Sequence, residues 1–416
     1  MVQGREKSLK INMILNAIKG IMSIVFPLIS FPYVSKILGV ENIGRYNFSN
    51  SIINYVVLFA GLGISTYAIR EGARLRNDKE EIRKFSNEMF SINVISTLVA
   101  YIGLFVLLIF VPKFHDYTSL LIILSLQVIF KTIGIEWIYS IYEDYAYITI
   151  RSIVFQVLSL ILLFLLVRTQ NDVDKYAAIT VVSSVGSNVM NYVHARKYCK
   201  VSLTTKIDWK KHIKPIMVLF AMSLTVTLYV SSDTTMLGLI CDDYTVGIYS
   251  VSTKIYSIVK TVLSSVLVVS IPRLSALLGE NKKNEFNEVS SDIYRTLLTL
   301  VLPSITGLIV LRKQVILLLS NSTYIRAESS LLLLSIALLF CLGAWFWGQC
   351  ILVPMKKENI VFKVTVVSAV VNVILNLDMI PIWKENAAAI TTVLAEASSF
   401  FYCSYTSHRN TKMSKN

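Results

Sequence analysis

The sequence is short of charge, histidine and cysteine. Charged residues make up 16% of the 416 residues, whereas an ordinary soluble domain carries about 25%. The five cysteines show no Cys-x-x-Cys spacing and the four histidines fall in predicted loops or the tail, so neither a metal site nor a disulfide framework is indicated. The chain also lacks a Gly-rich phosphate loop, a His–Glu zinc helix and a nucleophile elbow. We therefore expect no enzyme and no bound cofactor.

Apolar sequence is abundant instead. Hydrophobic residues make up 54% of the chain and the mean hydropathy is +0.62. Apolar runs of roughly 20 residues, the length that spans a bilayer as a helix, recur from end to end. They cover residues 9–33, 46–67, 89–111, 118–141, 148–167, 176–193, 215–240, 246–271, 295–311, 331–353, 361–382 and 387–405. The sequence thus predicts an all-α polytopic membrane protein with about twelve transmembrane helices.

The basic residues indicate an orientation. The net charge is +14, and the excess crowds the loops after the second and sixth segments, whereas the alternate loops hold few basic residues. This asymmetry follows the positive-inside rule and predicts that both termini lie in the cytoplasm. Because topology explains the excess, we expect weak contact with anionic membrane lipid and no nucleic-acid partner.

The two halves of the chain resemble each other. A shift of 203 residues places Gly44 on Gly247 and Arg70 on Arg273, and a shift of 211 places Ala178 on Ala389. Six helices per repeat is an even number, so both halves would insert in the same orientation, as in parallel-repeat transporters. We predict two pseudo-symmetric six-helix lobes, residues 1–200 and 215–406, joined by a basic linker 201–214 and followed by a tail 407–416. Chance alignment of apolar helices is the alternative.

Four lysines lie inside predicted spans, where each costs about 2.5–3.5 kcal/mol at a helix centre. We therefore expect them to face a water-filled cavity or an anion. Amide side chains on the polar faces of the helices accompany them, although small and hydroxyl residues on such faces often serve helix packing alone. The candidate substrate-binding residues are Lys19, Lys131, Lys254, Lys260, Asn16, Asn50, Asn54, Gln127 and Gln349.

Acids inside the spans are candidates for ion coupling. Glu396 is predicted near the middle of the last span and Asp233 near the outer end of the seventh. A buried carboxylate that must be neutralised by H⁺ or Na⁺ is a common coupling device in ion-driven transporters. Pairing of these acids with the deep lysines is the competing explanation.

Several motifs carry a family resemblance. FPLISFPYVS at residues 26–35, LGVENIG at 38–44, GISTYAIRE at 63–71, IEW at 135–137, YITIRS at 147–152 and DTTMLG at 233–238 resemble the corresponding segments of Wzx-type polysaccharide flippases. These flippases belong to the multidrug/oligosaccharidyl-lipid/polysaccharide exporter (MOP) superfamily. Asp378 departs from the pattern, because relatives usually carry an apolar residue there.

The resemblance implies a bilobed carrier of the bacterial cytoplasmic membrane. It would move undecaprenyl-pyrophosphate-linked oligosaccharide repeat units to the outer leaflet by alternating access, for O-antigen or capsule synthesis. Lys19, Lys131 and Lys254 would then line a cationic cavity for the diphosphate, and polysaccharide polymerase or assembly proteins are candidate partners. A small-molecule or multidrug exporter of the same fold is the nearest alternative. A membrane-embedded glycan polymerase or transferase is a second.

Overall fold

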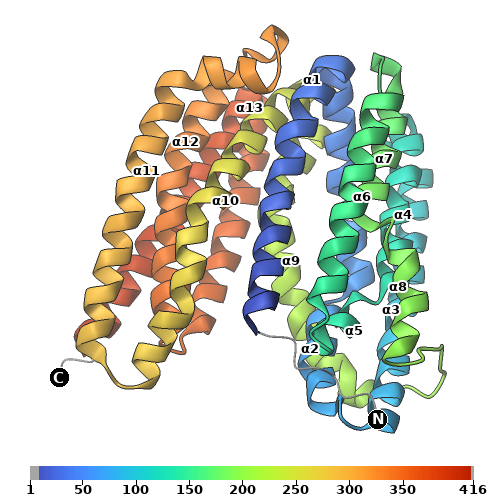
Figure 1. Cartoon of the computed structure of the whole chain (residues 1–416). Helices are drawn as coiled ribbons and strands as arrows, with labels where there is room; N and C mark the ends of the chain where they lie inside the picture. Colours follow the sequence, from blue (N-terminus) through green and yellow to red (C-terminus); the bar gives the residue numbers. More distant parts are fainter. Residues whose placement is uncertain (1–8, 414–416) are drawn as a thin grey trace. The chain divides into compact units, whose positions relative to one another are not determined.

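The computed structural model describes residues 9–413, with side chains at 18, 20–22 and 24–409. No strand occurs among these residues, and the helices of each half run in similar directions (Figure 1). The helices are α1 (Leu9–Gly61), α2 (Ile64–Leu75), α3 (Lys79–Phe110), α4 (Thr118–Gly134), α5 (Glu136–Ile141), α6 (Tyr145–Leu166), α7 (Val173–Val185), α8 (Asn188–His194), α9 (Trp209–Ile240), α10 (Asp243–Gly279), α11 (Lys283–Leu319), α12 (Ala327–Trp345) and α13 (Glu358–Met413). A π-helix, Phe346–Leu352, continues α12.

Within the described residues, nine helices are long and apolar enough to cross a membrane. Two of these helices, α1 and α13, each join two of the predicted segments at a bend. α1 bends at Gly39, with φ 77°, and α13 bends at Lys384, with φ 49°. The short pair α7 and α8 covers the remaining predicted segment, because the helix is interrupted between Val185 and Asn188. The predicted all-α polytopic architecture is therefore confirmed.

The chain divides into two compact units. Unit 1 consists of Met1–Leu38 and Phe48–Thr227, and unit 2 of Gly39–Asn47 and Leu228–Asn416. The division by contacts thus lies inside α9, and a short stretch after the α1 bend belongs to unit 2. The predicted lobe bounds, 1–200 and 215–406, stay a prediction about the repeat.

A buried cluster holds one end of unit 1 together. Tyr67 from α2, Phe85 and Met89 from α3, Trp137 from α5 and Ile216 from α9 all lie in it. The side chain of Asp78 caps α3 at this end, because it accepts hydrogen bonds from backbone N–H groups of the first turn of α3. Large apolar side chains from four helices therefore fix this end of unit 1.

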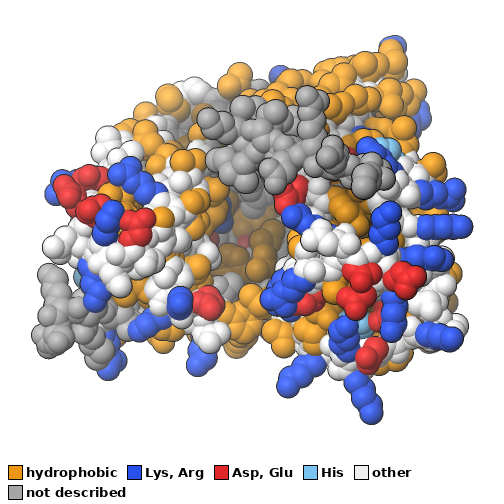
Figure 2. Space-filling view, turned by 60° about the horizontal axis from the view of Figure 1, so that its bottom comes forward, with side chains coloured by type: hydrophobic (Ala, Val, Ile, Leu, Met, Phe, Trp, Pro, Cys, Tyr) orange, Lys and Arg blue, Asp and Glu red, His pale blue; other side chains and the backbone are white. Residues whose placement is uncertain are grey.

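The same end carries basic loops. Arg74, Arg76 and Lys79, between α2 and α3, are exposed. Figure 2 shows many Lys and Arg side chains on this end, the lower one in Figure 1. The side of the membrane that it faces stays a prediction.

In unit 2, two glycines allow helices to touch. A Cβ on Gly44 would lie 1.8 Å from the carbonyl oxygen of Asp243, and a Cβ on Gly247 would lie 2.1 Å from that of Val40. Gly44 and Gly247 are the residues that the predicted repeat alignment pairs, and their contacts are reciprocal. Any larger residue at either position would push the backbones apart.

Candidate functional site

Asp233 in α9 is a buried acid of unit 2, 9% exposed, and no lysine or arginine pairs with it among the described residues. Its Oδ1 accepts a hydrogen bond from Asn376 Nδ2 at 2.7 Å, and its Oδ2 accepts from Tyr249 and Thr392, both at 2.8 Å. These donors come from α10 and from both halves of α13. A carboxylate in this setting is stabilised as an anion by hydrogen bonds rather than by a lysine or arginine.

A second layer of polar side chains supports the first. Asn376 Oδ1 accepts a hydrogen bond from Thr391 Oγ1 at 2.6 Å, and Asn376 Nδ2 also lies 3.2 Å from Asn372 Oδ1. Ser232 Oγ donates to Asn372 Oδ1 at 3.0 Å. Oxygen atoms from several helices therefore converge around Asp233, a donor set that suits a proton or a hard cation such as Na⁺.

Glu396 lies in a different environment. Its Oε1 is 3.9 Å from Lys260 Nζ and accepts a long hydrogen bond, 3.4 Å, from Tyr256. The side chains of Glu396 and Lys260 line a cavity of about 240 Å³, and Gln349 from the π-helix lies on its wall. Of the predicted site residues, the structure thus brings together Lys260, Gln349 and Glu396. Lys260 is the kind of neighbour expected if Glu396 pairs with a lysine inside the span.

The remaining predicted residues are distributed over both units. Lys131 and Asn54 are exposed, whereas Asn50, Gln127 and Lys254 are half-buried. In the part of the chain that the structure describes, Lys131 forms no ion pair. The side chains of Asn16 and Lys19 lie outside the described residues. No group of three or more His, Cys, Asp or Glu side chains that could hold a metal ion occurs among the described residues.

One functional candidate was missed because His212 was assigned to a loop. That assignment is wrong, because His212 lies in the first turn of α9 and is fully buried. Its Nε2 is 2.6 Å from Glu88 Oε2, and its Nδ1 is 2.9 Å from the Tyr67 hydroxyl. The signal that could have found it is its position three residues before the predicted segment 215–240, because helices often extend beyond the membrane segment.

A second ion pair of unit 1 was also missed. Arg151 Nη2 donates to Glu136 Oε1 at 2.5 Å, and the Arg151 side chain is 5% exposed. Both residues belong to sequence motifs that resemble the flippase family. The pair explains why Glu136 is tolerated near the end of a predicted span, since an intramembrane acid usually has a partner.

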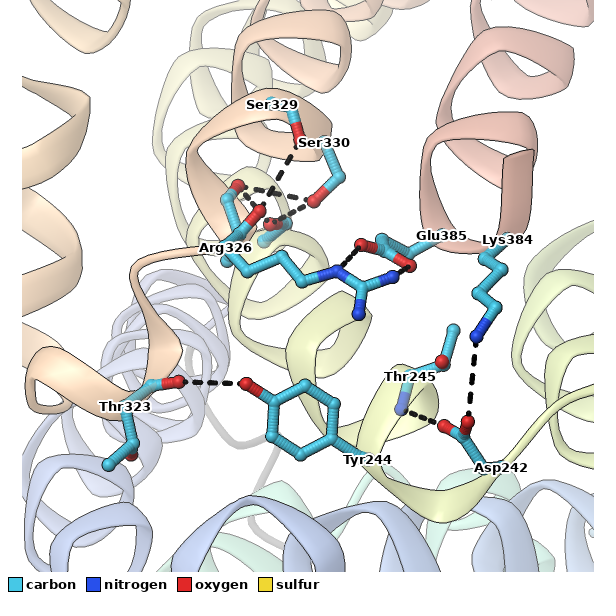
Figure 3. Close-up of polar contacts among 11 residues, drawn as sticks. Asp242, Tyr244, Thr245, Thr323, Arg326, Ser329, Ser330, Lys384 and Glu385 are labelled. Atoms are coloured by element: carbon cyan, nitrogen blue, oxygen red, sulfur yellow. Dashed lines mark hydrogen bonds and ion pairs between the residues drawn. The ribbon is translucent and has the colours of Figure 1, made fainter.

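A polar cluster ties three turns of unit 2 together (Figure 3). Arg326 donates to Glu385 through Nε at 2.6 Å and Nη2 at 2.9 Å, and the Glu385 side chain is 1% exposed. Lys384 Nζ lies 3.7 Å from Asp242 Oδ2. Burial opposes ionisation of Asp242, but its hydrogen bonds with Thr245 and the nearby Lys384 outweigh burial and lower the pKa of this carboxyl group. The turns before α10 and α12 and the bend of α13 are thereby joined.

Comparison with known proteins identifies the family. The family model described as polysaccharide biosynthesis protein matches residues 9–278, well over half of the chain. The chain belongs to this family. A second model, MatE, matches residues 218–377. The capsular polysaccharide biosynthesis protein CapF of Staphylococcus aureus is 23% identical over 367 residues, which cover 86% of this chain and 88% of CapF.

Solved structures of MOP transporters share the fold of this polysaccharide biosynthesis family member. The inward closed conformation of the lipid II flippase MurJ has a TM-score of 0.74 at 17% identity, covering 94% of this chain and 87% of MurJ. An inward-facing multidrug resistance MATE family transporter of the MOP superfamily has a TM-score of 0.69 at 12% identity, covering 97% and 98%. At these identities the likeness establishes the fold alone. The chain is thus a multi-pass membrane protein of the polysaccharide biosynthesis family with the fold of MOP transporters.

Proposed function

We propose that this transporter flips undecaprenyl-pyrophosphate-linked oligosaccharide repeat units from the inner to the outer leaflet of the bacterial cytoplasmic membrane. The units would serve O-antigen or capsule synthesis. Alternating access of the two units would move the glycan and diphosphate through a polar path while the lipid tail stays in the bilayer. Family membership supports a role in polysaccharide biosynthesis, and the finer assignment rests on the cationic side chains in the spans.

Lys131 is the observation that carries this proposal. It is exposed in α4, within an apolar helix that is long enough to cross the membrane. Lys131 lies in the last turn of α4, so its charge, facing lipid, would cost at most the ~2.5–3.5 kcal/mol of a helix centre. A water-filled path that carries an anionic diphosphate would remove this cost. An exporter of cationic drugs would need acidic side chains rather than lysines in that path, because acids attract cations.

We further propose that Asp233 couples transport to a cation gradient, with H⁺ or Na⁺ as the ion. The carboxylate is buried, is hydrogen-bonded by neutral donors and lies among oxygen atoms from α9, α10 and α13. Binding of a cation would neutralise it and change the cost of enclosing it in a low-dielectric interior. Glu396 is the weaker candidate, because Lys260 already lies beside it.

A genetic experiment tests the proposed substrate. Deletion of the gene in its own host should abolish the surface polysaccharide and leave lipid-linked repeat units accumulated on the inner leaflet. Expression of the wild-type chain should restore export, and Lys131→Glu should not, because it would repel the diphosphate. Lys131→Arg is the matched control that keeps the positive charge. Normal surface polysaccharide in the deletion strain would contradict the proposal.

A further inference from the structure

A second, larger cavity lies beside the polar cluster of Figure 3 and shares no lining residue with the cavity at Glu396. It has a volume of about 640 Å³ and runs between the start of α12 and the bend of α13 in unit 2. Four aliphatic side chains form its walls: Leu332, Leu333, Ile382 and Ile390. Polar groups line the groove at the ends of these helices, where Arg326, Ser329, Lys384 and Asn386 lie. A long apolar groove with a polar rim at the helix ends is the shape that one lipid molecule fills.

The position of the rim agrees with a membrane interface. Trp383 lines the groove beside the α13 bend and is 53% exposed. Tryptophan is enriched where headgroups meet acyl chains. The apolar walls follow the cations along the same helices, so the cations would lie at headgroup level and the walls at acyl level.

The backbone at Lys384 is strained. Its φ of 49° and ψ of −127° are unfavourable for a residue other than glycine, at a cost of order 1–3 kcal/mol. The Lys384 ammonium group points toward the turn that carries Asp242 (Figure 3). Strain of this kind persists where the surroundings hold it and is common at ligand sites.

Both cations have capacity for a ligand. The Lys384–Asp242 pair is 3.7 Å long with side chains 45% and 57% exposed, so the pair contributes little, about 0–1 kcal/mol. Arg326 uses Nε and Nη2 for Glu385, and Figure 3 shows its third nitrogen turned away from that carboxylate. A phosphate could therefore accept charge-assisted hydrogen bonds from Lys384 and Arg326 without breaking the buried pair.

The charge of the cluster selects the headgroup. Arg326 and Lys384 carry two positive charges, and Asp242 and Glu385 carry two negative charges. A neutral site with exposed groups of both signs complements a zwitterion better than an anion. An ethanolammonium group has N–H donors for Asp242, whereas a choline group has none.

We propose that this groove binds a phosphatidylethanolamine molecule, with its phosphate on Lys384 and Arg326 and its ammonium on Asp242. The acyl chains lie along the walls formed by Leu332, Leu333, Ile382 and Ile390. A free phosphate would use only the rim, and a phosphatidylglycerol headgroup would leave the Asp242 carboxylate repelled.

Native mass spectrometry of the purified chain in detergent, with dioleoyl phosphatidylethanolamine, phosphatidylcholine or phosphatidylglycerol added separately, tests this site. The wild-type chain should retain phosphatidylethanolamine about tenfold better than the other two, the ratio given by one hydrogen bond to a charged group. Lys384→Gln should weaken retention of all three lipids, because each presents its phosphate to Lys384. Lys313→Gln, an exposed lysine of α11 outside the groove, should retain all three as the wild type does.

Asp242→Asn keeps the experiment decisive if one variant folds poorly. It raises the charge of the cluster by one, so the preference should turn toward phosphatidylglycerol, an effect that unfolding cannot produce. Equal retention of the three lipids overturns the proposal. So does a wild-type preference for phosphatidylglycerol, displacement of the lipid by inorganic phosphate, or retention of phosphatidylethanolamine that is undiminished in Lys384→Gln.

Discussion

Asp233→Asn is the most informative perturbation of the coupling site. Three hydrogen bonds reach the Asp233 carboxylate, and each bond to a charged group contributes about 1.5–3 kcal/mol. Together they favour the anion by roughly 4.5–9 kcal/mol, against a desolvation penalty of several kcal/mol for a buried ion. The two terms are of similar size, so binding or loss of one cation can decide the charge state. Asparagine keeps the shape and removes the charge.

The folded protein should tolerate the change. The Asn amide would face the hydroxyl groups of Tyr249 and Thr392, which can accept as well as donate, so we expect a loss of no more than about 1–3 kcal/mol in stability. Transport should lose its response to ion gradients. Proteoliposomes that contain lipid-linked oligosaccharide, with an imposed proton or sodium gradient, measure that response as the rate at which the glycan becomes accessible outside.

Glu396→Gln is the matched control. Because Glu396 lies 3.9 Å from Lys260, its neutralisation should lower thermal stability and leave the gradient response in place. The loss should be smaller than the ~3–5 kcal/mol of a fully buried pair, since the Lys260 side chain is 31% exposed. An Asp233→Asn protein that responds to both gradients as strongly as the wild type would refute the reasoning.

Three further predictions test the structure. Gly44→Ala should destabilise the protein by more than the ~1–3 kcal/mol of ordinary overpacking, because its Cβ would lie 1.8 Å from a backbone oxygen. Gly307→Ala is the control: its Cβ meets nothing within 4 Å, so it should be neutral or stabilising. Equal melting temperatures of the two variants would contradict this prediction. His212→Ala should cost about 1–3 kcal/mol by removing a partner from a buried carboxylate, measured as the melting temperature, and an unchanged value would show that the contact contributes nothing. A cysteine at Lys79 should react with an impermeant thiol reagent only after cell lysis, and labelling in intact cells would reverse the topology.

The helices were predictable because apolar length is a local property. All twelve predicted segments fall on helices, including the two pairs that α1 and α13 join at Gly39 and Lys384. The ends of α10 and α11 were not predictable in this way. Both helices continue well past the predicted spans, to Gly279 and from Lys283, because polar helix outside the membrane leaves no hydropathy signal.

The shell around the buried acid was beyond sequence reasoning. Asp233 could be singled out as an acid in a span, but its partners Asn376 and Thr392 lie more than 140 residues away in the chain. Ser368, Asn372 and Asn376, each four residues apart on one helix, are a local signal of a polar face there. The choice between a coupling residue and half of an ion pair for Glu396 depends on its distance from Lys260. A sequence pattern does not give that distance.

Reconstituted flipping tests the central claim most directly. The purified chain, in liposomes loaded with undecaprenyl-pyrophosphate-linked oligosaccharide, should make the glycan accessible to an impermeant glycosidase on the opposite side. Lys131→Glu should abolish this transfer and Lys131→Arg should retain it. A wild-type preparation that leaves the glycan on its original side at the rate of protein-free liposomes would contradict the account.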